Sequence, residues 1–422
     1  MKLWIFHHYA TLPNLNGHIR PYKFAVHLGA HKFHTTIFAA SYQHFSDVNL
    51  IQDNTAYKSI SADKADFVFV NTPSSAAGKA ARIKNMMAFY RGLMTVCPNM
   101  KNKPDIILAS SPHPLAMLAG IKIAKKFNIP CLCEVRDLWP EAIFYATNIK
   151  SRSLIGRVLT SGEHWIYKHA DGLIFTKEGD IDYLKEHGWL ANQGGDIDIN
   201  HCYYINNGVD FGEYNNQIQE CRYADPDLES DTFKVVYAGT IRPVNNIANI
   251  VEAAKLLQNY KNIQFLIFGD GNQKQELEKR VEEEHIDNVV FKGYVEKKYI
   301  PYILSKSSVN LLNYSSSRYN WSRGNSSNKL FEYMASGRPI IATMKTGYSI
   351  IDKYKCGIEL DNDDPALLAS AILKVKNMPK ADYTNICNNA ANGVCNFDYK
   401  ILTEKLINAI NETLARKQGQ PR

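Results

Sequence analysis

Short apolar runs alternate with longer amphipathic stretches along almost the whole chain. The apolar runs of the first half are KLWIFHH (2–8), TTIFAAS (35–41), DFVFVNT (66–72), DIILASS (105–111), PCLCEV (130–135) and GLIFTK (172–177). Those of the second half are KVVYAGTI (234–241), IQFLIFGDG (263–271), VVFKGYV (289–295), VNLLNYS (309–315) and PIIAT (339–343). Apolar strands that alternate with helical patterns are typical of parallel sheets covered by helices. We therefore predict an α/β protein with two Rossmann-like halves.

A polar region separates the two halves. It comprises the Gly-containing run 192–201, the strand CYYINNGVD (202–210) and the polar stretch 214–231. Domain boundaries fall in polar connections of this kind. We place the boundary near residue 210, which predicts one domain over 1–210 and a second over 211–396.

Composition is that of an ordinary globular enzyme. The chain has 422 residues, of which 45% are hydrophobic and 22% charged, which suits two or three domains with sizeable cores. It has no apolar run of 18 residues, and the opening MKLWIFHHYA is too short and too His-rich for a secretory signal. We expect a cytoplasmic protein. Its eight scattered Cys are interpreted as reduced thiols.

Positive charge is concentrated in the first third of the chain. Residues 1–130 hold 15 Lys and Arg against 5 Asp and Glu, a net charge of +10, whereas the whole chain carries +7. Four cations share one predicted helix with six apolar residues: Lys79, Arg82, Lys84 and Arg91 with Met86, Met87, Phe89, Tyr90, Leu93 and Met94. Such a helix can lie on an anionic membrane surface. Alternatively, its apolar side packs on its own sheet. Nucleic acid is not expected, because no recognised binding module accompanies the basic residues.

The segment SSNKLFEYMASGRPIIAT (326–343) carries helix start and stop signals around one carboxylate. A Ser precedes the first apolar residue, Gly337 follows the last, and Pro339 lies beyond. In an open parallel sheet, the N-terminus of such a helix faces the ligand crevice, where unpaired N–H groups attract phosphate. Glu332, one turn further in, can hold ribose hydroxyls. The alternative is an ordinary surface helix with a solvated Glu332.

Four further motifs accompany these patterns: EVRDLWPE (134–141), HADGLIFTKE (169–178), INNGVD (205–210) and FGDGNQKQEL (268–277). With the opening strand, the loop after it and the Glu332 helix, they resemble glycosyltransferase family 4 of the GT-B fold, in the branch that assembles bacterial capsule and O-antigen polysaccharides. The resemblance implies two Rossmann-like domains that face each other across a cleft, the first binding the acceptor and the second the nucleotide sugar. It also implies that 397–422 is a helix that crosses back to the first domain and ends in a disordered tail.

In the first domain the resemblance singles out the loop after the first strand and one histidine. The loop 10–20 carries Gly17 and Arg20 and resembles the family's glycine-rich loop over the donor diphosphate, although this chain has one glycine where the family often has two. His113, between a strand and a helix, occupies the place of a cleft residue that hydrogen-bonds the donor sugar. A helix-capping or surface His113 is the alternative.

EVRDLWPE follows a predicted strand, so Arg136, Asp137 and Glu141 are expected at the carboxyl edge of the sheet, where ligands bind. The resemblance places this string in the cleft, and Arg136 and Asp137 are candidate catalytic residues. The alternative is a buried Arg136–Asp137 pair that locks the loop, with Trp139 as packing.

In the second domain the family's usual phosphate-binding side chains are absent. The family commonly has a Glu eight residues before the position of Glu332, and an Arg and a Lys after the first strand; the corresponding residues here are Gly324, Thr240 and Asn245. The cations that can replace them are Arg242, Arg323 and Lys329, of which Arg242 is a candidate catalytic residue. The predicted donor site is completed by Thr240, Glu332 and the backbone N–H groups of Ser327, Asn328 and Lys329.

No DxD pair follows an early strand, so we predict a reaction without a metal ion. The resemblance implies retention of anomeric configuration, no protein nucleophile, and mainly electrostatic stabilisation of the leaving group. We predict a retaining glycosyltransferase that moves a sugar from a UDP-linked donor to a lipid-linked oligosaccharide, with no cofactor besides this substrate. The alternatives are a transferase with a soluble small-molecule or protein acceptor, and an inactive GT-B binding subunit.

Overall fold

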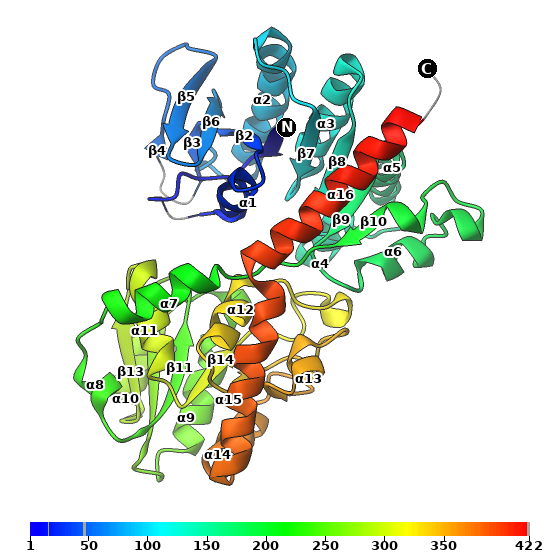
Figure 1. The fold of residues 1–422 in the computed structure, drawn as a ribbon. Coiled ribbons are helices and arrows are strands. Elements are labelled where there is room, and N and C mark those ends of the chain that lie inside the picture. The colour runs from blue at the N-terminus through cyan, green and yellow to red at the C-terminus, as the bar shows by residue number, and fades with distance from the viewer. Residues whose placement is uncertain (16, 45–47, 420–422) are drawn as a thin grey trace. The chain divides into compact units, whose positions relative to one another are not determined.

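The computed structural model describes residues 1–15, 17–44 and 48–419. The chain divides into two compact units, one formed by Met1–Asn206 with Leu402–Arg422 and the other by Asn207–Ile401. Each unit is built on its own mainly parallel sheet with helices along it (Figure 1). The two units are Rossmann-like domains, as the strand pattern predicts.

Unit 1 contains an eight-stranded sheet with the order β10-β9-β8-β7-β1-β2-β6-β5. Its strands are β1 (Lys2–His7), β2 (His34–Ala40), β5 (Tyr57–Ala62), β6 (Ala65–Val70), β7 (Ile106–Ser110), β8 (Cys131–Val135), β9 (Gly172–Phe175) and β10 (Cys202–Tyr204). All neighbouring strands run parallel except β5, which pairs antiparallel with β6. A separate two-stranded sheet joins β3 (Tyr42–Gln43) to β4 (Val48–Asn49).

The helices of unit 1 are α1 (Arg20–Gly29), α2 (Lys79–Val96), α3 (Pro114–Phe127), α4 (Trp139–Ala146), α5 (Leu154–His169), α6 (Asp180–Glu186) and most of α16 (Tyr399–Gly419). The last helix joins this unit by polar contacts: Tyr203 donates to Glu412 at 2.8 Å, and Arg416 donates to the carbonyl oxygen of Asp171 at 3.1 Å. It continues to Gly419, so the predicted disordered tail is wrong for 415–419, and 420–422 lie outside the described residues.

Unit 2 contains a six-stranded parallel sheet with the order β13-β12-β11-β14-β15-β16. Its strands are β11 (Phe233–Ala238), β12 (Ile263–Phe268), β13 (Val289–Gly293), β14 (Val309–Leu312), β15 (Ile340–Ala342) and β16 (Gly357–Glu359). Its helices are α7 (Phe211–Glu220), α8 (Pro226–Glu229), α9 (Ile247–Leu256), α10 (Lys274–Glu283), α11 (Ile300–Ser305), α12 (Asn328–Ala335), α13 (Ile350–Tyr354), α14 (Pro365–Lys376) and α15 (Lys380–Val394).

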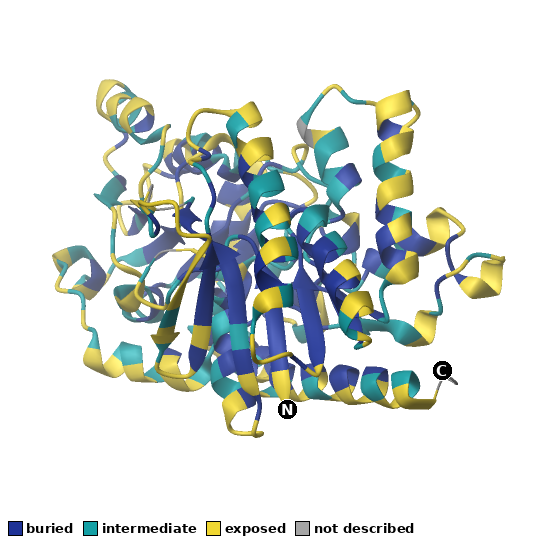
Figure 2. Cartoon of the chain, turned by 90° about the horizontal axis from the view of Figure 1, so that it is seen from above, coloured by how far each residue is buried: buried dark blue, intermediate teal, exposed yellow. Residues whose placement is uncertain are grey.

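Strand β11 shows why both sheets are apolar on both faces. Val236 and Ala238 belong to a core that includes residues of α12 and α15, whereas Val235 and Tyr237 belong to a second core with residues of α9 and α14. Successive side chains point to opposite faces of a sheet, so a strand covered by helices on both sides is a continuous apolar run. The central strands of the sheet in view are accordingly mostly dark blue, while the helices carry exposed positions on one side (Figure 2).

The basic helix α2 packs part of its apolar side against its own sheet. Phe89, Leu93 and Val96 are buried in the unit 1 core. The four cations named above, Lys79, Arg82, Lys84 and Arg91, are all exposed. Within the described residues, no helix has the length and apolar character needed to cross a membrane. The packing interpretation is confirmed for Phe89 and Leu93, and a membrane role for the exposed cations stays a prediction.

Candidate active site

Helix α12 begins where the sequence predicts, with Ser327 in extended conformation at its N-cap position. The backbone N–H of Ser327 donates to Asn325 Oδ1 at 2.8 Å, so this predicted phosphate donor is already engaged. The N–H groups of Asn328 and Lys329 lie in the first helical turn and have no intrahelical acceptor. These two groups present the positive end of the helix dipole.

Lys329 lies at the carboxyl end of β11, although it comes from α12. Its ammonium donates to Tyr237 Oη at 2.8 Å and lies 4.5 Å from the centre of the Tyr237 ring and 5.1 Å from that of Tyr314. Gly239 makes room for it, because a Cβ at that position would lie 2.4 Å from Lys329 Cε. The lysine is therefore held beside β11 and the glycine that follows this strand.

The environment of Lys329 weakens its positive charge. Burial, and then the nearby Arg242 guanidinium, lower the pKa of Lys329 to about 7, while Glu332 acts in the opposite direction. A buried lysine without a matching anion loses its proton more readily than a solvated one. An anion placed beside this ammonium would restore the charge.

The loop after β11 is braced by its own polar side chains. Thr240 is exposed, and its carbonyl oxygen accepts hydrogen bonds from Tyr237 Oη at 2.9 Å and from the amide of Asn245. The amide of Asn313 in turn donates to the carbonyl oxygens of Asn245 and Asn246 at 2.7 and 2.8 Å. Asn245 thus holds the loop where the family has a cation, and the charge at this strand end comes from Lys329.

The two predicted arginines differ in exposure. Arg242 is exposed just before a short 3-10 turn, Pro243–Asn245, and its positive charge helps to lower the pKa of Lys329. Arg323 is only 6% exposed and ends another 3-10 turn directly before Gly324, whose φ of +105° favours glycine. Arg242 is therefore accessible to an anion, whereas Arg323 is buried.

Glu332 is partly accessible and already has a cationic neighbour. Its side chain is 19% exposed, and Oε1 lies 3.4 Å from the ammonium of Lys297. This carboxylate raises the pKa of Lys297. Its backbone is fixed as well, because Tyr214 Oη donates to the Glu332 carbonyl oxygen at 2.9 Å. Glu332 is thus a positioned carboxylate rather than a fully solvated one, and Lys297 is a neighbour that sequence reasoning missed.

In unit 1, Arg20 is buried in an ion pair. It is the first residue of α1, is 4% exposed, and donates to Glu134 Oε1 through Nε at 2.9 Å and Nη2 at 2.8 Å. Its remaining donors reach the carbonyl oxygens of Ile205 and Asn206 at 2.8 and 2.6 Å. Burial raises the pKa of Glu134, but Arg20 and other donors outweigh this, so the pKa lies below its usual value. Arg20 ties β8 to the segment after β10, and Gly17, with φ of +149°, precedes it in an exposed part of the loop.

Arg136 directly follows β8, and its side chain lies between His7, at the carboxyl end of β1, and His18 of the loop after β1. Its Nη1 is 2.9 Å from His7 Nε2 and 3.0 Å from His18 Nδ1. A guanidinium only donates, so both ring nitrogens are acceptors and both histidines are neutral. Burial, and then Arg136, lower the pKa of His7 and bring that of His18 to about 3. Asp137 Oδ1 lies 3.9 Å from the ammonium of Lys177.

His113 is neither a helix cap nor a surface residue. It holds the N-cap position of α3 without a side-chain capping bond and is 1% exposed. Its ring lies 4.6 Å from that of His8, and burial lowers its pKa to about 3. Among the described residues, neither ring nitrogen of His113 has a hydrogen-bond partner. Buried polar groups are normally paired, so this ring has hydrogen-bonding capacity left for another molecule.

Two family models match the chain in sequence. The model of glycosyl transferases group 1 matches residues 223–393, and that of the glycosyl transferase 4-like domain matches residues 22–193. No curated protein matches the chain. The chain therefore carries both domains of a GT-B glycosyltransferase.

Solved structures show the same fold at low sequence identity. Sucrose-phosphate synthase from Thermosynechococcus elongatus has a TM-score of 0.72 and 16% identity, with 99% of this chain and 100% of that one covered. Anabaena Alr3699/HepE in complex with UDP-glucose has a TM-score of 0.63 and 14% identity, with 99% and 100% covered. WaaG, a glycosyltransferase involved in lipopolysaccharide biosynthesis, has a TM-score of 0.64 and 12% identity, with 97% and 99% covered.

Proposed function

We propose that this GT-B glycosyltransferase moves a sugar from a UDP-linked donor to a lipid-linked oligosaccharide in capsule or O-antigen synthesis, with retention of configuration. The observation that carries the proposal is the arrangement on α12. The ammonium of Lys329 and the open N–H groups of the first turn favour a diphosphate, and the Glu332 carboxylate, one turn further along, suits ribose hydroxyls.

The chemistry assigned to these residues is electrostatic. The bond between the anomeric carbon and the β-phosphate oxygen breaks, a bond to the acceptor oxygen forms on the same face, and the departing phosphate takes the acceptor's proton. Lys329 and Arg242 stabilise the charge that develops on the leaving diphosphate, without a metal ion. The His113 ring, which has open hydrogen-bonding capacity, is assigned to a sugar hydroxyl, and Arg136 and Asp137 to the acceptor side.

Support for the donor and acceptor classes comes from the structural relatives. HepE binds UDP-glucose, and WaaG is involved in lipopolysaccharide biosynthesis. Both share the fold of this chain from end to end, so a UDP-linked donor is the natural first choice. A lipid-linked acceptor places the enzyme in the cytoplasm at the inner face of the membrane.

A nucleotide-release screen tests the proposal. Purified protein is incubated with UDP-, GDP- and TDP-sugars, each with and without a bacterial lipid extract, and the free nucleoside diphosphate is measured. We expect one UDP-sugar to be consumed faster when the lipid extract is present. Full transfer to water-soluble acceptors without lipid would replace the proposed acceptor, and no turnover of any donor would indicate a binding subunit.

A further inference from the structure

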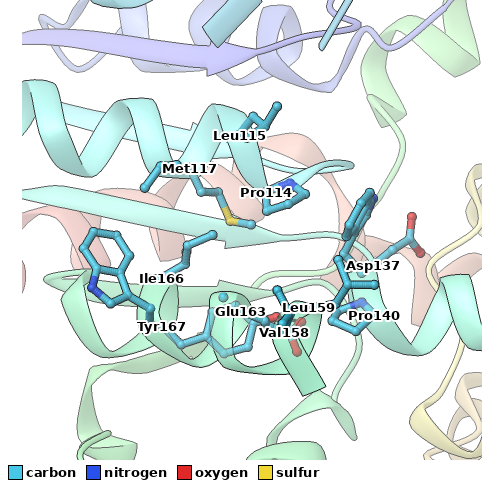
Figure 3. A pocket seen from close by; sticks show the side chains of 14 residues that line it. Pro114, Leu115, Met117, Asp137, Pro140, Val158, Leu159, Glu163, Ile166 and Tyr167 are labelled. Carbon is cyan, nitrogen blue, oxygen red and sulfur yellow. Dashed lines mark hydrogen bonds between the residues drawn. The ribbon is translucent and has the colours of Figure 1, made fainter. Parts of the chain in front are cut away.

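An apolar pocket lies in unit 1 between α3, α4 and α5 (Figure 3). Its volume is about 250 Å³, which exceeds the roughly 150 Å³ of an apolar cavity able to hold benzene. Its walls include Leu115, Leu118, Trp139, Pro140, Val158 and Ile166. Such a lining suits a hydrocarbon and offers little to a polar molecule.

The polar side chains that line the pocket give no reason to expect a polar ligand. Glu163 is 5% exposed, and its two oxygens accept from Tyr167 Oη and Tyr183 Oη, each at 2.6 Å. Burial, only partly offset by these hydrogen bonds, raises the pKa of Glu163 to about 7. Asp137 lies at one end of the pocket, close to the carboxyl end of β8 (Figure 3).

The pocket continues into exposed apolar side chains on the first turns of α5. Leu154 is 80% exposed, Ile155 59% and Val158 65%, and Val158 also lines the pocket. Single exposed apolar residues are common, but three within two turns of one helix, beside an apolar pocket, mark an interaction site. We call these three residues and the pocket the α5 face.

Cations surround the exposed apolar residues at the start of α5, whereas the acidic residues Asp137 and Glu163 line the pocket itself. Lys150, Arg152 and Arg157 are exposed, and residues 142–162 contain no Asp or Glu. Cations beside exposed apolar side chains attract a molecule with both an anionic head and an apolar chain. A peptide partner would not require this pairing of an apolar pocket with three cations.

We propose that the α5 face binds the lipid part of the acceptor: the pocket holds a segment of its hydrocarbon chain, and Lys150, Arg152 and Arg157 contact its phosphates. This rests on the proposed function, because it names the lipid moiety of the same acceptor. With the chain in the pocket, the lipid's phosphates and the saccharide attached to them lie at the end where α5 begins.

Calorimetry with farnesyl diphosphate tests this site. The chain and diphosphate are used together, with inorganic pyrophosphate as the head-only probe and saturating UDP present to occupy the nucleotide site. Gly162 lines the pocket, and a Cβ there meets no atom within 4 Å, so Gly162→Phe fills the pocket without a backbone clash. Ser161→Phe, at an exposed neighbouring position outside the lining, is the matched control.

We expect farnesyl diphosphate to bind at least tenfold more tightly than pyrophosphate, Gly162→Phe to weaken it at least tenfold, and Ser161→Phe to leave it unchanged. Replacing Lys150, Arg152 and Arg157 by Ser should weaken binding and its dependence on salt. Equal affinities for the parent protein and Gly162→Phe, or for farnesyl diphosphate and pyrophosphate, overturn the proposal. The assay needs no turnover, so an enzyme that consumes a UDP-sugar but fails here refutes the α5 face alone.

Discussion

The lowered pKa of Lys329 predicts a specific pH dependence of nucleotide binding. At a pKa of about 7, this lysine loses its charge as pH rises through neutrality. UDP next to the ammonium favours the charged form, so binding takes up a proton and the affinity falls as pH rises. Above pH 7 the dissociation constant should rise about tenfold per pH unit until the pKa of the complex is reached.

The magnitude follows from the contact. A hydrogen bond to a charged group contributes about 1.5 to 3 kcal/mol, so Lys329→Met should weaken UDP binding roughly 10- to 100-fold at pH 7. Its binding should then be nearly independent of pH, because the titrating group is gone. Lys329→Arg should also give a flat profile at higher affinity, since a guanidinium stays charged throughout.

Calorimetric titration of UDP between pH 7 and pH 9 measures this directly, above the phosphate's own titration near pH 6. Lys297→Met is the matched control, because Lys297 lies beside Glu332 and its pKa is raised. That variant should keep the steep profile. Parallel profiles for the parent protein and Lys329→Met would refute the assignment of Lys329 to the diphosphate.

Three further outcomes follow. Glu134→Gln removes the charged partner of buried Arg20 and should lower the free energy of unfolding, measured by urea denaturation, by about 3 to 5 kcal/mol. The control Asp361→Asn, in an exposed pair with Lys345, should leave the denaturation midpoint unchanged. An equal effect of both substitutions would refute the structural role of Arg20. Transfer should persist in excess EDTA, and loss of turnover that Mg²⁺ or Mn²⁺ restores would contradict the metal-free account. If the cations of α2 hold the enzyme on anionic vesicles, binding should fall with salt and fall further when all four become Ser, namely Lys79, Arg82, Lys84 and Arg91; binding unaffected by either change leaves only packing.

The strands that could be predicted are the ones buried on both faces. β11 and β12 are continuous apolar runs, and periodicity alone finds them. β5 was missed because it is an edge strand with mostly exposed residues, including Lys58 and Ser59, and its pairing with β6 is a tertiary contact. β16 has only three residues, which is too short to show a pattern.

The candidate site divides in the same way. Lys329 and Glu332 share one local segment with helix start and stop signals, so their joint position could be inferred from the sequence. The Arg20–Glu134 pair joins residues separated by 114 positions, and the phenol that holds Lys329 belongs to Tyr237 on strand β11. Such partners depend on how distant elements pack, which no local pattern encodes.

The same limit explains His113. Its place between a strand and a helix is legible in the sequence, and a capping role was a reasonable alternative there. The pairing of β1 with β7 accompanies a His8 ring that lies 4.6 Å from that of His113, and His113 is buried. Burial excludes a surface His113, which sequence position alone could not decide.

The central claim is that Glu332 holds the ribose of the donor nucleotide, and one comparison tests it most directly. UDP and 2′,3′-dideoxy-UDP are titrated into the parent protein, Glu332→Ala and the control Lys297→Met, with thermal unfolding as a check on folding. Two hydrogen bonds to a carboxylate, each contributing about 1.5 to 3 kcal/mol, predict that the parent protein and Lys297→Met prefer UDP by roughly 150- to 25,000-fold. Glu332→Ala should fold normally and bind both nucleotides equally; if it keeps the parent's preference for UDP, the ribose assignment is wrong.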